Sequence, residues 1–100
     1  MDSKTYSFKA KLWIYDGPAA WHFITLPQDV AEDIELHYGH VKRGWGSLPV
    51  EVQVGQTKWS TSIFTDKKSG SFLLPIKSKV RQQAGITAAD SPEFILKISS

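Results

Sequence analysis

The chain has 100 residues, which is enough for one domain and too few for two separate cores. It contains no cysteine, which excludes disulfide bonds and thiolate metal sites. Its formal net charge of +2 is too small to indicate a general nucleic-acid binder. The opening residues carry no apolar signal core, and no run reaches the length of a membrane span. We therefore expect a soluble cytoplasmic protein with no membrane contact, a single domain over residues 1–100.

The first half of the chain predicts two strands and a helix. From Tyr6 to Tyr15 apolar and polar residues alternate, as in a half-buried strand. After an Asp-Gly-Pro turn, a second strand is predicted from Trp21 to Leu26. A proline then opens a helix predicted from about Gln28 to Tyr38, whose apolar residues recur at four-residue spacing. Gly39 is expected to cap this helix.

The second half repeats this pattern. Alternating residues predict strands over Val50–Val54 and Trp59–Phe64, joined by a tight turn. A short apolar strand from Ser71 to Leu74 then meets a proline and a basic helix that stops at Gly85. Phe94–Ile98 is the predicted closing strand.

A strand, a Leu-Pro pair and a helix thus occur twice, at Leu26-Pro27 and at Leu74-Pro75. This repetition predicts a pseudo-twofold fold that is mainly β, a small barrel of about six strands capped by two short helices. The two helices differ in charge, since the first is acidic and the second is basic. The side chains expected to be mostly buried are Trp21, Phe23, Val52, Trp59, Ile63, Leu73 and Val80.

The stretch RGWGSLPVEVQVGQTKWSTSIFTDKKSGSFLLPIKSKVRQQAGI resembles the signature of domain-of-unknown-function family 1905, and WHFITLP upstream resembles the opening of that family. The resemblance covers about residues 8–98. It implies a bacterial domain with a double-split β-barrel, similar to a swapped-hairpin dimer folded within one chain, and no established activity. In some relatives the domain resembles the N-terminal part of YdeI/OmpD-associated, bacteriocin-protection-like proteins. Relatives tend to show a Gly-Asp turn before the last strand, where this chain has Ala88-Ala89-Asp90-Ser91-Pro92.

The sequence contains no recognisable catalytic or metal-binding pattern. His37 and His40 are three residues apart, but Gly39 is expected to end the helix between them, and there is no HExxH pattern. The hydroxyl residues of the run Ser60-Thr61-Ser62 lack a GxSxG turn. We therefore predict no catalytic residues, no metal and no cofactor.

One group of residues favours binding of an anion: Arg43, Trp45, Lys77 and Arg81. Lys77 stands near the start of the second helix, Arg43 offers a bidentate donor, and Trp45 offers a flat aromatic face. The alternative interpretation is that these cations are merely solvated, with their aliphatic stems covering apolar surface.

These observations predict a non-enzymatic binding module for a small anionic ligand or a partner protein. Two alternatives remain open: a DNA-binding regulator of the swapped-hairpin barrel type, and an enzyme acting on a sugar or nucleotide. A twofold DNA reader needs two basic halves, whereas the first helix here is acidic, so we expect no sequence-specific DNA binding. Because both halves lie in one chain, we expect a monomer.

Overall fold

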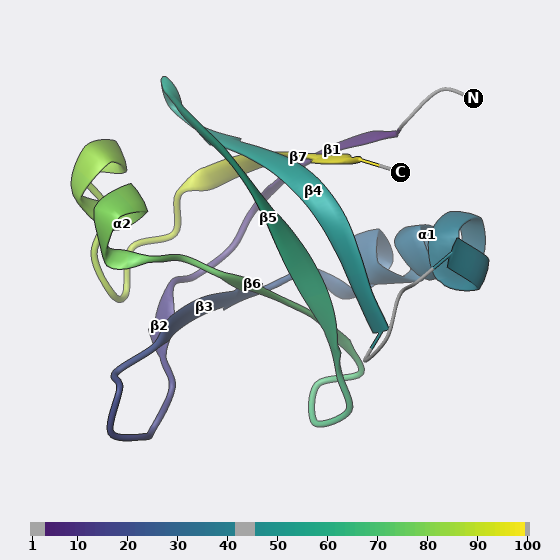
Figure 1. The fold of residues 1–100 in the computed structure, drawn as a ribbon, viewed down its shortest axis with the longest axis horizontal. Coiled ribbons are helices and arrows are strands. Elements are labelled where there is room, and N and C mark those ends of the chain that lie inside the picture. Colours follow the sequence, from purple (N-terminus) through teal and green to yellow (C-terminus); the bar gives the residue numbers. More distant parts are fainter. Residues whose placement is uncertain (1–3, 42–45, 100) are drawn as a thin grey trace.

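The computed structural model describes residues 4–41 and 46–99. The described residues form one curved antiparallel sheet, wrapped as a half-barrel, with two short helices at opposite ends (Figure 1). In chain order the elements are β1 (Thr5–Lys9), β2 (Trp13–Ile14), β3 (His22–Thr25), α1 (Gln28–Tyr38), a 3-10 turn (Gly39–Val41), β4 (Ser47–Val54), β5 (Thr57–Asp66), β6 (Ser71–Pro75), α2 (Ser78–Ala84) and β7 (Glu93–Ile98). The mainly β class with two short helices is therefore confirmed.

The two outermost strands of the sheet are consecutive in the chain. The strand order is β1-β7-β4-β5-β6-β3-β2. Only residues 10–12 separate β1 from β2 in the chain, so the sheet must curve enough to bring its two edge strands close together. In this link the Leu12 N–H donates to the Asp90 carbonyl (2.9 Å), and the Ala89 N–H donates to the Leu12 carbonyl (3.0 Å). The single strand predicted over Tyr6–Tyr15 is wrong, because its middle pairs with a connector instead of a strand. The described residues consequently form seven strands instead of about six.

The pairing of β3 with β6 is symmetric about Ile24 and Leu74, which are direct partners. On one side the Leu26 N–H donates to the Phe72 carbonyl (3.0 Å), and on the other the Ile76 N–H donates to the His22 carbonyl (2.9 Å). The equivalent positions are 24 and 74, a separation of 50, and the helices begin at 28 and 78, again 50 apart. The two Leu-Pro pairs are only 48 apart, from 26 to 74. Leu26 therefore corresponds in space to Ile76. The two Leu-Pro pairs that repeat in the sequence do not occupy equivalent positions in the structure.

The two helices end differently. Gly39 has φ −56°, a right-handed value, and the chain continues as a 3-10 turn to Val41. Gly39 is therefore the C-cap of α1, as predicted, although it takes the right-handed conformation and its N–H donates to the Glu35 carbonyl. Gly85 has φ 68°, and its N–H donates to the Arg81 carbonyl. This left-handed cap of α2 is the one that a glycine permits at little cost, as predicted.

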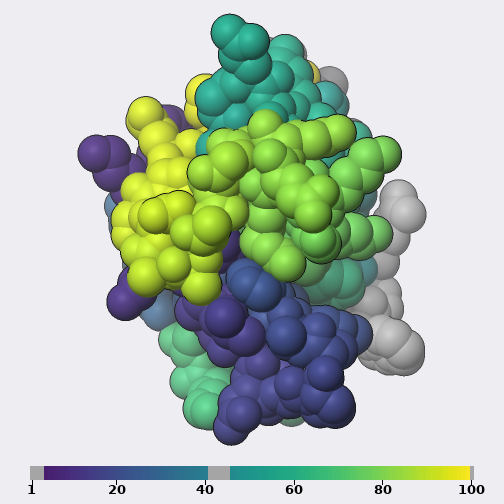
Figure 2. All heavy atoms as spheres, turned by 90° about the vertical axis from the view of Figure 1, so that its left-hand side faces the viewer, coloured from purple at the N-terminus to yellow at the C-terminus, as the bar shows by residue number. Residues whose placement is uncertain are grey.

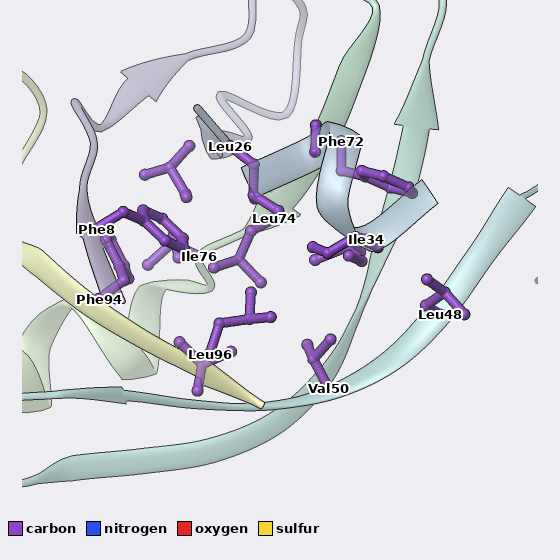
Figure 3. Close-up of a cluster of buried hydrophobic side chains, with 14 of the residues drawn as sticks. Phe8, Leu26, Ile34, Leu48, Val50, Phe72, Leu74, Ile76, Phe94 and Leu96 are labelled. Atoms are coloured by element: carbon purple, nitrogen blue, oxygen red, sulfur yellow. The ribbon is translucent and has the colours of Figure 1, made fainter. Parts of the chain in front are cut away.

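The core lies between the inner face of the sheet and α1 (Figure 3). Alternate residues of β4 and β7 point into it, together with the inward face of α1. Of the side chains predicted to be buried, Val52, Ile63 and Val80 are buried, Trp59 is partly buried against the core, and Phe23 and Leu73 are half-buried. Trp21 is 62% exposed, so its predicted burial is wrong. Neither helix in the described part of the chain is long and apolar enough to cross a membrane.

Candidate functional site

A groove of about 690 Å³ lies between the β2–β3 turn, the strands β3, β5 and β6, and helix α2. Figure 2 shows the part of the surface where α2 (light green) lies next to the β2–β3 hairpin (purple to dark blue). The residues that line the groove are Ala19, Ala20, Trp21, His22, Phe23, Phe64, Leu73, Pro75, Ile76, Lys77, Ser78 and Arg81. This volume is within the usual range of small-molecule sites, about 300–1,000 Å³.

Strand register assembles the apolar floor of the groove. Phe23 lies opposite Pro75, and Phe64 lies opposite Leu73. Because successive side chains of a strand point to opposite faces, these residues lie on the face away from the buried neighbours Ile24, Ile63 and Leu74. The floor is thus an apolar area on the outside of the half-barrel, which the core does not cover.

Helix α2 brings the charged residues to one end of the groove. It begins shortly after β6, so Lys77 immediately precedes it and Arg81 lies one turn along it. Lys77 is exposed, whereas Arg81 is partly buried and its Nη1 donates to the Ile76 carbonyl (2.7 Å). Among the described residues that line the groove, none is Asp or Glu. The local field at this end therefore favours an anion.

Aromatic rings gather around Phe23 in the β2–β3 hairpin, across from the start of α2. The ring of Trp21 lies 6.3 Å from that of Phe23 at an interplanar angle of 67°, and Trp13 and Tyr15 contact Phe23 at 5.4 and 6.3 Å. Trp13 is fixed by its indole N–H, which donates to Thr25 Oγ1 (3.0 Å). Trp21 therefore stands on a supported aromatic cluster with most of its own surface open to solvent.

The sequence-predicted anion site is only partly described. Lys77 and Arg81 line the same groove, as expected of neighbours on one short helix. Arg43 and Trp45 lie outside the described residues, so their place in the site stays a prediction. The next part of that loop is described, and Ser47 pairs with Phe64, which lines the groove.

Sequence reasoning missed the aromatic part of the groove. Trp21 and Phe23 were assigned to the core, although the strand also carries Ile24 and Leu26 on its other face. A strand that is apolar on both faces needs two apolar environments, and the core supplies only one of them. The second apolar face was the available signal for a surface site.

A polar cluster around Asp33 joins β1 to α1 on another part of the surface. The Tyr6 hydroxyl donates to Asp33 Oδ2 (2.7 Å), and Lys4 Nζ lies 2.9 Å from the same oxygen. The pKa of Asp33 is lowered mainly by the hydrogen bond from Lys4 and, to a smaller extent, by the one from Tyr6. The pKa of Tyr6 is raised mainly by burial and, to a smaller extent, by its hydrogen bond to Asp33. The Lys4 backbone N–H also donates to the Tyr38 hydroxyl (2.8 Å). These bonds attach the first strand to the helix and need no ligand to explain them.

Two of the histidines, His22 and His37, bond to backbone carbonyls of their own segments. His22 Nδ1 is 2.8 Å from the Ala20 carbonyl, and His37 Nδ1 is 2.9 Å from the Asp33 carbonyl. A carbonyl can only accept, so each Nδ1 carries the proton. Within residues 4–41 and 46–99, no three His, Asp or Glu side chains form a group that could hold a metal ion.

Comparison with known proteins gives a family and no activity. None of the curated proteins compared matches the chain. One family model, described as a domain of unknown function (DUF1905), matches residues 8–95 and so spans both the half-barrel and the groove. The chain therefore belongs to the DUF1905 family.

Proposed function

We propose that this domain is a non-enzymatic binding module whose groove takes a small anionic ligand. The observation that carries the proposal is the pairing of two cations, Lys77 and Arg81, with an apolar groove that has no acidic residue among its described lining. In such a site the apolar walls supply most of the contact area, and a few charged groups fix the orientation. Arg81 contributes a planar fork that is already held in place by the Ile76 carbonyl.

The first residue of β4 supports the same location. Ser47 and Phe64 are paired, and Phe64 and Lys77 line one groove. The predicted contribution of Arg43 and Trp45 therefore remains part of the proposal, to be tested separately from that of the α2 residues.

A panel of small anions with matched neutral analogues, screened by thermal shift, tests the proposal. A ligand that binds the native state raises its melting temperature by mass action. For a binding anion, Lys77→Gln and Arg81→Gln should each weaken affinity by about tenfold, since a hydrogen bond to a charged group contributes about 1.5–3 kcal/mol. Lys68→Gln is the matched control, because Lys68 is exposed in the β5–β6 turn and does not line the groove. Binding that all three variants retain would refute the proposed site.

The localisation, the oligomeric state and the exact type of barrel are also proposed. We infer a cytoplasmic monomer with a double-split barrel, supported by the symmetric β3–β6 pairing and by β3, β6, α1 and α2 all lying in one chain. Light scattering that found an obligate dimer, dissociating only on unfolding, would contradict it.

A further inference from the structure

We infer that the ligand of the groove is a flat aromatic carboxylate, bound with its carboxylate beside Lys77 and Arg81 and its ring system against Trp21 and Phe23. This inference rests on the proposed function and adds to it the chemical class of the ligand. Three properties of the groove support this inference: the origin of its polar groups, the head group that these groups match, and the ligand shape that its apolar residues accept.

The polar groups of the groove come mainly from one element. Lys77, Ser78 and Arg81 all come from α2 or the residue before it, whereas β3, β5 and β6 contribute mainly apolar residues. The remaining polar lining residue is His22, whose Nδ1 proton is directed to the Ala20 carbonyl. A ligand that satisfies this arrangement has a charged head group facing α2 and an apolar body against the strands.

The head group is best matched by a carboxylate. The bond from Arg81 Nη1 to the Ile76 carbonyl, 2.7 Å long, uses one donor of a guanidinium that has five and fixes its plane. A planar acceptor with two oxygens suits such a fork. A phosphate dianion would bring a second charge and more bound water against Pro75 and Ile76, with only Lys77 and Arg81 among the described lining residues to offset it.

The apolar body is best matched by fused or single aromatic rings. The planes of Trp21 and Phe23 are inclined at 67° with centroids 6.3 Å apart, so they present two differently oriented surfaces. A flat ring can stack on one of them and approach the other edge-on, which are the two favoured aromatic geometries. A flexible alkyl chain would gain contact area there but neither of these geometries, and it would lose more conformational freedom on binding.

The test titrates the ¹⁵N-labelled chain with four probes: 2-naphthoate, 2-naphthalenemethanol, decanoate and 2-naphthyl phosphate. Amide shifts locate each probe, and the concentration dependence gives its Kd. We expect 2-naphthoate to perturb groove residues with a Kd at least about tenfold lower than those of the other three probes. The alcohol tests the need for charge, decanoate the need for a ring, and the phosphate the choice of head group.

Two aromatic variants test the orientation. Trp21→Ala should weaken 2-naphthoate by about tenfold and Trp21→Phe by less, since phenylalanine keeps an aromatic face. Tyr15→Ala is the matched control, because Tyr15 is also an exposed aromatic residue of the hairpin (53%, against 62% for Trp21) and contacts Phe23, but does not line the groove. Trp21 is 62% exposed, so its replacement should leave the unliganded spectrum folded.

The outcomes separate this inference from the proposed function. If decanoate or 2-naphthyl phosphate binds the groove as tightly as 2-naphthoate and is lost in Lys77→Gln, the aromatic-carboxylate class is wrong and the anion site stands. An equal loss in Tyr15→Ala and Trp21→Ala would also overturn the inferred orientation. If no anionic probe perturbs the groove, both the inference and the proposed function fail.

Discussion

Replacing Leu96 by alanine tests the packing on which the groove depends. Leu96 is 0% exposed and lies in β7 between Tyr6 of β1 and Val52 of β4, so its side chain is enclosed in the core. A Leu→Ala change at such a site loses the transfer free energy of the removed atoms and creates a cavity, together about 3–4 kcal/mol. For a domain of this size each kcal/mol lowers the melting temperature by about 4–8 °C. The expected fall is therefore about 12–32 °C.

Leu36→Ala provides the same chemical change without burial. Leu36 lies in α1 and is 77% exposed, and alanine is at least as good a helix former as leucine, so we expect a loss below about 0.5 kcal/mol. Urea unfolding of both variants, followed by circular dichroism, gives the two free energies directly, provided that the m-values agree. If the two variants had similar midpoints, the inward face assigned to β7 would be wrong. Should Leu96→Ala fail to fold, Leu96→Met keeps the volume and should cost less than about 1.5 kcal/mol.

Three further predictions concern the Asp33 cluster and the connector before β7. Because the pKa of Asp33 is lowered in the folded state, its stabilisation is present above the ordinary carboxyl pKa of about 3.9 and is lost as the pH falls through the folded pKa. Urea unfolding of Asp33→Asn should therefore show a cost near neutral pH that shrinks as the pH falls below about 3.9, and a cost that does not change with pH would contradict this. The pKa of Tyr6 is raised, so stability should decline as the pH rises above about 10, and Tyr6→Phe should remove that decline. Ala89 has φ 78°, where glycine is favoured, so Ala89→Gly should raise stability by up to about 1 kcal/mol, whereas Ala88→Gly, the control, should lower it.

Much of the fold could be predicted because most elements have a simple period. The alternation in Val50–Val54 and Phe94–Ile98 places their buried residues correctly, since one face of each strand meets the core. The break at Leu12 could not be predicted, because Leu12 continues the alternation and is itself fully buried. The strand ends there because Leu12 hydrogen-bonds with Asp90, which lies 78 residues further along the chain.

The candidate site was half predicted. The basic residues Lys77 and Arg81 could be proposed as ligand-binding residues because basic residues recur along the predicted second helix. The aromatic half was not found, because alternation separates Trp21 from Ile24 but does not say which face turns inward. That choice follows from the partner strand: Ile24 lies opposite Leu74, and both are fully buried.

The position of β7 has a consequence for how the chain folds. This strand is the last of the described strands in chain order, yet it lies between β1 and β4, and its register joins Lys97 to Thr5 (Figure 1). Until it is available, β1 has no neighbour in the sheet, and the core lacks Phe94, Leu96 and Ile98. A nascent chain can therefore form the local β4–β5 hairpin early, but the half-barrel can close only after β7 has left the ribosome. Pairings between such distant residues carry a large loop-closure cost, so we expect folding to be slow for the size of the domain.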